Sequence, residues 1–338
     1  MKNLKYFLLL VVAMVAGTLI IGCSSDDYMG EAQQQGISPT TRGVSDKMPK
    51  LTTYIETNDV NPLNAGEYYF TGTDPQEQVI DNVILFASNI RGAASTVQLY
   101  HNNNQSHILT NAGTLIAPLQ QKGIRVSLGL LGDHTGVGFC NLTPAMIESF
   151  AQQIAACVKQ YNLDGVDFDD EYADYWKAPS NLPSPSTMIF GNLVKRVRQL
   201  LPDKLITVFS FGGYTNFDAT TMNAISYMWP DFGADWSTPG GLGNSKWAKM
   251  SIHCTDGRPS AGVIQSSAAN YSGYGAIMMF NLRESGQTSL MNNFASRVWG
   301  GKTVSRTTTI YAKNYLRDMQ DPRDIPDPQD VPDSWEHP

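Results

Sequence analysis

Residues 163–175 carry the sequence Leu-Asp-Gly-Val-Asp-Phe-Asp-Asp-Glu-Tyr-Ala-Asp-Tyr. In this stretch Asp167, Asp169 and Glu171 occupy every second position, and apolar residues precede and separate the first two. Alternate side chains of a β-strand share one face, so the spacing predicts three carboxyl groups on one face and apolar side chains on the other. Neighbouring carboxyls on that face would lie about 6.5 to 7 Å apart, where each charge raises the proton affinity of the next.

This arrangement suits a reaction that needs one protonated carboxylic acid beside an ionised one, which is the requirement of glycoside cleavage. A calcium loop is an alternative, but an EF-hand needs glycine at its sixth position and glutamate at its twelfth. Counting from Asp164 or Asp167 finds neither. An acidic surface turn is the other alternative. The apolar lead-in, with Val158 and Leu163 before Gly165, indicates instead that the acids end a buried segment.

Length and composition limit the other classes of function. The chain has 338 residues, of which 42% are hydrophobic and 16% charged, enough to bury one large core. Its net charge of -7 comes without a Lys/Arg cluster, so nucleic acid is not an expected partner. No His or Cys spacing is typical of a zinc site, and we predict neither metal nor cofactor. The chain is expected to act as a monomer.

The N-terminus has the layout of a signal peptide, with Lys2 and Lys5 before an apolar run over 6–22. The four residues that end at Cys23, Ile-Ile-Gly-Cys, resemble a bacterial lipobox. That likeness implies removal of residues 1–22 and lipid attachment at Cys23. An uncleaved membrane anchor is the alternative, because the run approaches the length that spans a bilayer. Either way, the folded part would work outside the cytoplasm while tethered to a membrane.

The expected location is therefore the cell envelope, on the outer membrane. The acidic residues that follow Cys23 favour display on the cell surface. Residues 23–46 are polar and lack apolar periodicity, as in a flexible linker. Residues 306–338 repeat Asp-Pro units and are predicted to form a polar tail, not a second folded domain.

Between them, residues 47–305 alternate short β-rich runs with longer helical stretches. Eight strands are predicted: 51–56, 82–88, 124–131, 165–169, 205–211, 224–229, 250–254 and 276–282. Helices are predicted over 108–121, 144–161, 187–201 and 289–299, most of them with cap or breaker residues at their ends. This alternation predicts an α/β fold, a single (β/α)8 TIM-type barrel.

The acidic strand is the fourth of the eight. Active sites of such barrels lie at the C-terminal ends of the strands, so Asp169 and Glu171 fall where catalysis is expected. The three remaining cysteines, Cys140, Cys157 and Cys254, allow at most one disulfide, and their pairing stays open.

Residues 164–171 also resemble a known signature, the DGxDxDxE motif of glycoside hydrolase family 18. The continuation of this motif through Tyr172 and Ala173 is similar to the endo-β-N-acetylglucosaminidases of the Endo H and Endo F type. Residues 118–126 and 131–139 resemble the third strand and following loop of those enzymes, 227–229 their sixth strand, and 275–282 with 294–300 their closing strand and helix. The resemblance spans roughly residues 50–305.

The family's mechanism is retaining and substrate-assisted, and the resemblance implies a role for each matching residue. Glu171 would protonate the glycosidic oxygen and later activate water. Asp169 would orient the substrate's 2-acetamido group, and Asp167 would share a proton or hydrogen bond with Asp169. Tyr227 would donate a hydrogen bond to the acetamido oxygen; a half-buried barrel aromatic is the alternative interpretation.

Six more positions are expected to bind substrate. They are Gly132 and Phe139 in the loop after the third strand, the aromatic residues Trp229 and Trp236, and Asp231 and Asn281 near strand ends. Aromatic faces pack well on sugar rings, but core packing explains Trp229, Phe232 or Trp236 equally well. Asp231 marks a departure, because Pro230 and Asp231 stand where the Endo H type usually has Asn after Tyr-x-Trp.

The implied reaction cuts the β-1,4 bond between the two core N-acetylglucosamines of an N-linked glycan or glycoprotein, and the preferred glycan class stays open. A chitinase is the first alternative. Many chitinases insert a domain between their seventh and eighth strands, and the roughly 20 residues from Cys254 to Ala276 are too few for one. A non-catalytic glycan-binding lipoprotein on the same barrel is the second alternative. Inactive relatives typically lose the acid that Glu171 provides here.

Overall fold

The computed structural model describes residues 46–73 and 76–315. The predicted signal peptide, Cys23 and nearly all of the linker lie outside the described residues, as does the tail from residue 316.

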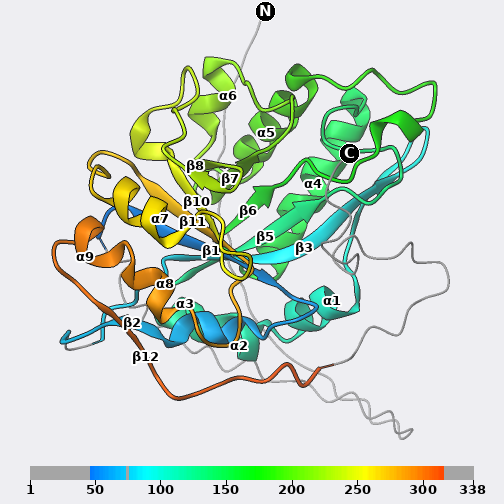
Figure 1. Ribbon diagram of the computed structural model, residues 1–338. Coiled ribbons are helices and arrows are strands. Elements are labelled where there is room, and N and C mark those ends of the chain that lie inside the picture. The colour runs from blue at the N-terminus through cyan, green and yellow to red at the C-terminus, as the bar shows by residue number, and fades with distance from the viewer. Residues whose placement is uncertain (1–45, 74–75, 316–338) are drawn as a thin grey trace, which may run out of the picture. The chain divides into compact units, whose positions relative to one another are not determined.

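Eight parallel strands form the centre of the described part (Figure 1). They are β1 (Lys50–Glu56), β3 (Asn82–Gly92), β5 (Arg125–Leu131), β6 (Gly165–Phe168), β7 (Leu205–Ser210), β8 (Tyr227–Pro230), β10 (Met250–His253) and β11 (Ala276–Phe280). Hydrogen bonding runs in the order β8-β7-β6-β5-β3-β1-β11-β10. The circle closes between β8 and β10 through a parallel bridge of Met228 with Trp247, where the Ala248 amide donates to the Met228 carbonyl at 3.0 Å. The predicted (β/α)8 barrel is confirmed, and each predicted strand has its counterpart.

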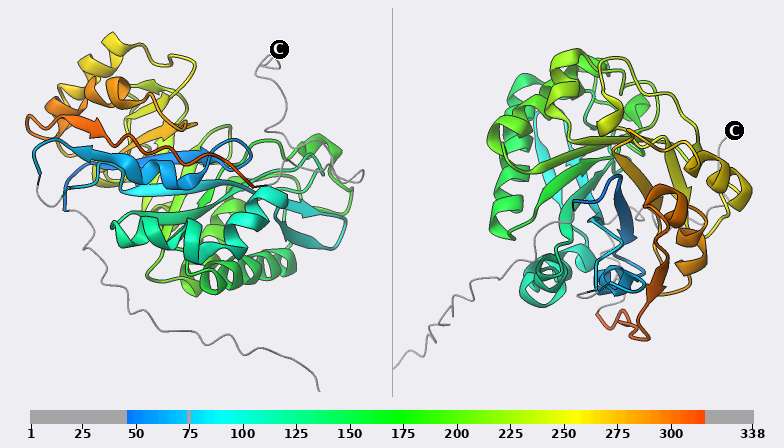
Figure 2. Two further views of the ribbon diagram at one scale, coloured as in Figure 1. Left: turned by 90° about the horizontal axis from the view of Figure 1, so that it is seen from below. Right: turned by 90° about the vertical axis from the view of Figure 1, so that its left-hand side faces the viewer.

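Helices surround the strands, as the two views of Figure 2 show. Two of the long ones match their predictions, α4 (Pro144–Gln160) and α5 (Thr187–Leu200), with α6 (Ala219–Ala224) and α7 (Ala261–Ala268) in later crossovers. Thr143 caps α4 by accepting from the Met146 amide, and Ser186 caps α5 in the same way. Between β10 and β11, residues 254–275 hold α7 and no strand.

Two helix predictions were too simple. The predicted helix over 108–121 is three short helices, α1 (Asn103–Thr110), α2 (Ala112–Leu115) and α3 (Ala117–Gln121). Pro118 cannot donate a backbone hydrogen bond inside a helix, so a new helix, α3, begins with Pro118 in its first turn. The predicted helix over 289–299 is α8 (Thr288–Asn292) followed by α9 (Ala295–Val298).

Several small elements were not predicted. They are β2 (Tyr68–Phe70) paired with β12 (Val304–Arg306), β4 (Val97–Tyr100) folded back on β3, β9 (Gly233–Ala234) paired with β10, and the 3-10 helices η1 (Pro62–Glu67), η2 (Tyr175–Lys177) and η3 (Asn244–Lys246). Each is only two to six residues long, too short to show a clear period in sequence.

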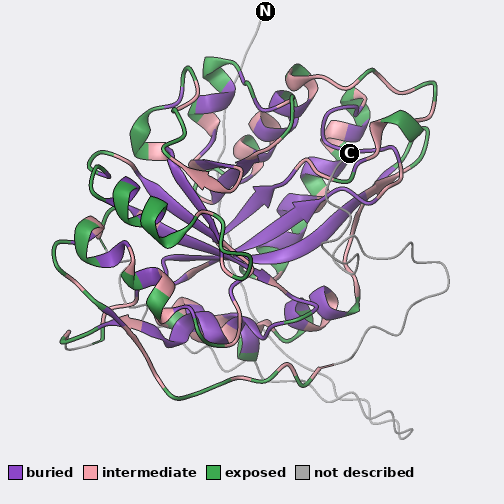
Figure 3. Ribbon diagram, in the orientation of Figure 1, coloured by how far each residue is buried: buried purple, intermediate pink, exposed green. Residues whose placement is uncertain are grey.

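The core has two layers, and the strands are buried along nearly their whole length (Figure 3). A small inner cluster fills the barrel, and it includes Tyr54, Phe86, Phe209, Trp229 and Met278. The larger outer cluster lies between strands and helices. In that outer layer Phe139, Phe168 and Phe190 pack with ring centroids 5.3 to 5.8 Å apart, and this packing holds α5 behind β6.

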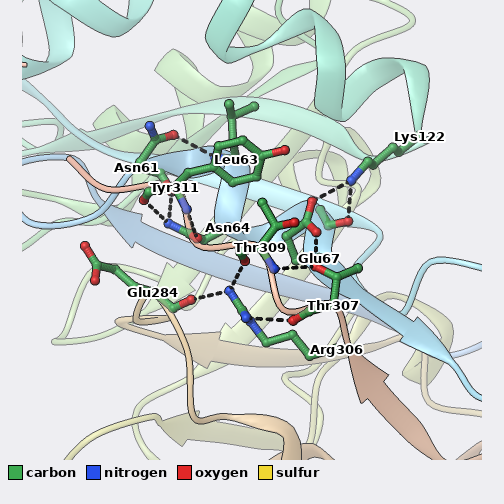
Figure 4. Close-up of polar contacts among 11 residues, drawn as sticks. Asn61, Leu63, Asn64, Glu67, Lys122, Glu284, Arg306, Thr307, Thr309 and Tyr311 are labelled. Carbon is green, nitrogen blue, oxygen red and sulfur yellow. Dashed lines mark hydrogen bonds and ion pairs between the residues drawn. The ribbon is translucent and has the colours of Figure 1, made fainter. Parts of the chain in front are cut away.

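The chain that follows β12 packs against η1 on the outside of the barrel (Figure 4). The side-chain Nδ2 of Asn64 donates to the Tyr311 carbonyl at 2.7 Å, and the backbone amide of Thr307 donates to the Glu67 carbonyl at 3.0 Å. Lys122 Nζ joins η1 to the end of α3 by donating to Glu67 Oε1 at 2.8 Å. The predicted tail therefore begins with about ten residues that contact the domain. Among the described residues, no helix is both long and apolar enough to span a membrane.

Gly275, directly before β11, offers a test of the close packing between the start of that strand and η3. A Cβ there would lie 1.7 Å from the Ser245 carbonyl oxygen, which is backbone and cannot rotate away. We expect Gly275→Ala to lower the free energy of unfolding by about 3 kcal/mol through overpacking, measured by urea unfolding.

Gly262→Ala is the matched control. It lies in α7 with nothing within 4 Å of its added Cβ, so the same change should be neutral or stabilise the helix. Equal stability of the two variants would contradict the close packing of η3 against the start of β11.

Candidate active site

The acidic segment continues beyond the end of β6. The Asp169 amide donates to the Leu130 carbonyl at 3.0 Å, and the Gly132 amide donates to the Glu171 carbonyl at 3.0 Å. The segment therefore stays extended beside the loop that follows β5, although β6 itself ends at Phe168, one residue earlier than predicted. Side chains keep alternating, so Asp169 and Glu171 come to the same side.

Glycines in the loop after β5 allow this close approach. A Cβ on Gly132 would lie 2.3 Å from the Glu171 carbonyl oxygen, and one on Gly138 would lie 2.6 Å from the Tyr175 hydroxyl. A side chain at either position would push the acidic segment away. Gly132, predicted to bind substrate, is buried and supports the backbone of Glu171 instead.

Asp167 lies deepest of the three acids and is fully buried. Its carboxylate accepts from the Tyr54 hydroxyl at 2.8 Å and from Thr207 Oγ1 at 2.5 Å. Burial raises the pKa of Asp167 to about 7, against these two hydrogen bonds, which lower it. Tyr54 in turn accepts from Trp229 Nε1 at 2.8 Å, and burial raises the pKa of Tyr54 so that it remains a donor.

Asp169 and Glu171 contact each other through their carboxyl groups. Burial, then the charges of Glu171 and Asp167, raise the pKa of Asp169 well above its usual range. Burial also raises the pKa of Glu171, to about 7, while the hydrogen bond from Asp169 lowers it. Two carboxyls in such contact cannot both ionise near neutral pH, so the pair holds a shared proton. Asp169 Oδ1 is buried and has no hydrogen-bond partner among the described residues.

Asp231 and Tyr227 both come from β8 and its end, but the structure places them differently. Asp231 follows the strand, and its charge adds to the raised pKa of Glu171. Tyr227 begins the strand, and in the strand register it is level with Thr207 and Asp167, below the Asp169–Glu171 pair. Burial raises its pKa, and the charges that act on it are those of Arg125 and Asp81, at the N-terminal ends of β5 and β3. The structure therefore does not bring the Tyr227 hydroxyl to the carboxyl pair.

Two residues predicted to bind substrate are instead part of the core. Phe139 is 0% exposed and stacks on Phe190 outside the barrel. Trp229 is 0% exposed and lies inside the barrel, where no sugar face reaches it. The prediction was wrong for both, because an aromatic residue in a sequence carries no sign of whether a sugar or a neighbouring side chain covers it.

Two others lie where a ligand could meet them. Trp236, after β9, is 47% exposed. Asn281 directly follows β11, has a left-handed backbone with φ of 58°, and accepts from Arg283 Nη1 at 2.7 Å.

Sequence reasoning missed the buried partners of the acids. Tyr54 and Thr207 come from β1 and β7, and nothing in their own sequence neighbourhoods marks them. Asp170 was visible inside the motif, and it points to the other side of the segment, towards Tyr175 and Cys140. In the described part of the chain, all three cysteines are free thiols, and no group of three His, Cys, Asp or Glu side chains is arranged to hold a metal ion.

Comparison with known proteins supports the assignment of this site. No protein-family model matches the chain. An endo-β-N-acetylglucosaminidase of Flavobacterium sp. (strain SK1022) is 32% identical over 274 residues, which cover 79% of this chain and 84% of that protein. Endo-β-N-acetylglucosaminidase F1 of Elizabethkingia meningoseptica is 31% identical over 317 residues, covering 87% and 92%.

Solved structures agree. EndoBT-3987 of Bacteroides thetaiotaomicron, crystallised with a Man9GlcNAc2Asn substrate, matches with a TM-score of 0.70 and 30% identity over 80% of this chain and 70% of that one. Its complex with a Man5GlcNAc product matches with a TM-score of 0.69, and there this chain spans 65% of the solved chain. A chitinase of the same organism shares the fold alone, with a TM-score of 0.51 and 13% identity.

A parallel eight-stranded barrel with paired carboxyls beyond its fourth strand defines a glycoside hydrolase. The chain belongs to the endo-β-N-acetylglucosaminidases of glycoside hydrolase family 18.

The raised pKa of Asp169 predicts a cost in stability. Its folded pKa exceeds the unfolded value of about 4, so its contribution to stability is present below that pH and is lost as the pH rises towards the folded pKa. We expect Asp169→Asn to raise the Tm by about 3 °C or more at pH 8, and by less at pH 5. Thermal unfolding followed by circular dichroism at the two pH values measures this.

Asp218→Asn is the control, because Asp218 caps α6 and hydrogen bonds from Thr221 lower its pKa. That variant should gain nothing at pH 8. An Asp169→Asn protein no more stable than wild type at pH 8 would contradict the buried, proton-sharing pair.

Proposed function

We propose that this protein hydrolyses the β-1,4 bond between the two core N-acetylglucosamines of N-linked glycans, with retention of anomeric configuration. One observation carries the proposal: two buried carboxyl groups in contact, one of which has a buried oxygen without a partner among the described residues. The relatives named above support the substrate class, and EndoBT-3987 was crystallised with such a glycan.

Substrate binding would place the shared proton on Glu171. The 2-acetamido N–H of the sugar donates to Asp169 Oδ1, the oxygen that none of the described residues contacts by a hydrogen bond. A hydrogen bond to the ionised form of a carboxyl lowers its pKa, so Asp169 gives up the proton and Glu171 holds it. Glu171 then has the state that a general acid needs near neutral pH.

Bond cleavage follows in two steps. Glu171 protonates the glycosidic oxygen while the acetamido oxygen attacks the anomeric carbon, and the leaving sugar departs with its new hydroxyl. The cyclic oxazolinium intermediate carries positive charge next to ionised Asp169, which stabilises it most in the transition state. Glu171, now ionised, takes a proton from water, and the water oxygen attacks the anomeric carbon from the side of the departed group. The bond between that carbon and the acetamido oxygen breaks, which restores the 2-acetamido group. Two inversions give net retention.

Asp167 would adjust the charge of Asp169 during this cycle. It lies beneath Asp169, with Tyr54 and Thr207 donating to it, and its raised pKa of about 7 lets it hold or release a proton at neutral pH. The role predicted for Tyr227 is not part of this mechanism, because that residue begins β8, below the level of the carboxyl pair.

The envelope location is a further part of the proposal. We propose lipid attachment at Cys23 and a monomeric enzyme tethered to the outer membrane, supported by the lipobox-like sequence before Cys23 and the polar stretch after it. Incorporation of labelled palmitate into the wild type, and its loss in Cys23→Ala, is the expected result. Equal labelling of both proteins would contradict the anchor.

Glycan release tests the reaction itself. A denatured glycoprotein that carries high-mannose chains should shift to lower mass on a gel and keep one N-acetylglucosamine on asparagine, as seen by mass spectrometry. Glu171→Gln should lose turnover by about 10²- to 10⁴-fold, because it cannot supply a proton, while glycan affinity is largely kept.

Glu148→Gln, which changes a glutamate paired with Arg196 on the outer helices, should keep wild-type activity. Hydrolysis of chitin oligomers without glycan release would favour the chitinase alternative. Glycan binding without hydrolysis would favour the non-catalytic glycan-binding lipoprotein. Full activity in Glu171→Gln would remove the proposed acid.

A further inference from the structure

Asp170 lies between the two acids in sequence and points to the opposite side of the extended segment. Its Oδ1 accepts from the Tyr175 hydroxyl at 2.5 Å, and its Oδ2 accepts from Cys140 Sγ at 2.9 Å. The Cys140 amide donates to the same Tyr175 oxygen at 3.0 Å. These three bonds form a closed ring that joins the acidic segment, η2 and the loop after β5.

Each side chain of this ring has the protonation state that its hydrogen bonds require. Burial, then the charge of Asp170, raise the pKa of both the Cys140 thiol and the Tyr175 hydroxyl, so each remains a donor. Burial raises the pKa of Asp170 to about 6 against the hydrogen bonds, which lower it, so the carboxyl is mostly ionised at pH 7. The charge of Asp170 then acts on Glu171, the next residue, and raises the pKa of Glu171.

We propose that Asp170 is a positioning residue for the reaction: held by Tyr175 and Cys140, it fixes the orientation of the carboxyl pair and places a negative charge next to Glu171 that keeps the acid protonated. The inference rests on the proposed function. It adds a part that neither the carboxyl motif nor the relatives' names assign.

The groups that face this site come from three directions. Asp169 and Asp170 act on Glu171 from its own segment, and Asp231 acts from the end of β8. Cys140 and Tyr175 face Asp170 from the loop after β5 and from η2. Asp174, the residue directly before η2, is paired with His134 at 2.8 Å and Lys177 at 2.7 Å, so its charge is balanced locally.

Two kinetic effects distinguish a positioning role of Asp170 from a purely structural one. Removing the charge of Asp170 makes Glu171 easier to ionise, so the alkaline limb of the kcat/KM profile moves to lower pH. Asp170 points away from the side that Asp169 and Glu171 share, so the loss falls on kcat and leaves KM nearly unchanged. Loosened packing alone would not shift the limb.

The test compares pH profiles of glycan release by the full-length protein and its Asp170→Asn variant, which keeps the size and one acceptor oxygen. We expect kcat to fall about tenfold at pH 7, KM to change less than twofold, and the alkaline limb to move down by about one pH unit. Asp174→Asn, the same change four residues further on, should leave the limb in place.

Tyr175→Phe keeps the proposal testable if Asp170→Asn does not fold. It removes the donor to Asp170, which makes that carboxyl harder to ionise, so the limb should move in the same direction by less. Cys140→Ser retains a donor and should keep the wild-type profile. If the wild type is active and the alkaline limb does not move in Asp170→Asn, the inference about Asp170 is wrong. If Asp170→Asn does not fold, an unmoved limb in Tyr175→Phe has the same meaning. An inactive wild type would instead overturn the proposed function.

Discussion

The site depends on the contact between two buried carboxyl groups, Asp169 and Glu171, that cannot both be ionised near neutral pH. Burial alone would favour the protonated form of each, and the charge of one then favours the proton on the other. The pair therefore shares one proton, which in the proposed mechanism is the proton that Glu171 gives to the glycosidic oxygen. A fold that buries such a pair gives up stability above about pH 4, which is the expected exchange at a catalytic site.

The rest of the barrel holds this contact in place. Below the pair, Tyr54 and Thr207 hold Asp167, and Trp229 holds Tyr54, so the floor of the site is a hydrogen-bonded unit inside the barrel. Beside the pair, the glycines of the loop after β5 let the backbone of Glu171 lie against Gly132. Residues from β1, β5, β6, β7 and β8 therefore contribute to the environment of the carboxyl pair.

The sequence predicted the fold well, because eight β-rich runs separated by helical stretches have few alternatives to a closed barrel. The carboxyl motif was also visible, since alternation in an extended segment is a local property. Long-range contacts were not visible. Tyr54 and Thr207 lie 113 and 40 residues from Asp167, and only folding brings them to it. The errors at Phe139 and Trp229 have the same cause, because burial is decided by distant parts of the chain. The predicted 108–121 helix ends where α3 ends, but it was drawn as one helix although the chain is broken before Pro118.

The protonation state of the pair can be observed directly. Carbon-13 NMR of side-chain carboxyls in the full-length protein, titrated from pH 4 to pH 9, resolves groups by the pH at which they ionise, and Glu171→Gln and Asp169→Asn assign them. We predict that Asp169 and Glu171 titrate as a coupled pair, with Glu171 near pH 7, and that both variants lose this coupled titration while Asp167 still titrates near pH 7. If all carboxyls of the wild type instead ionise below pH 5, no proton is shared and the account given for this site is wrong.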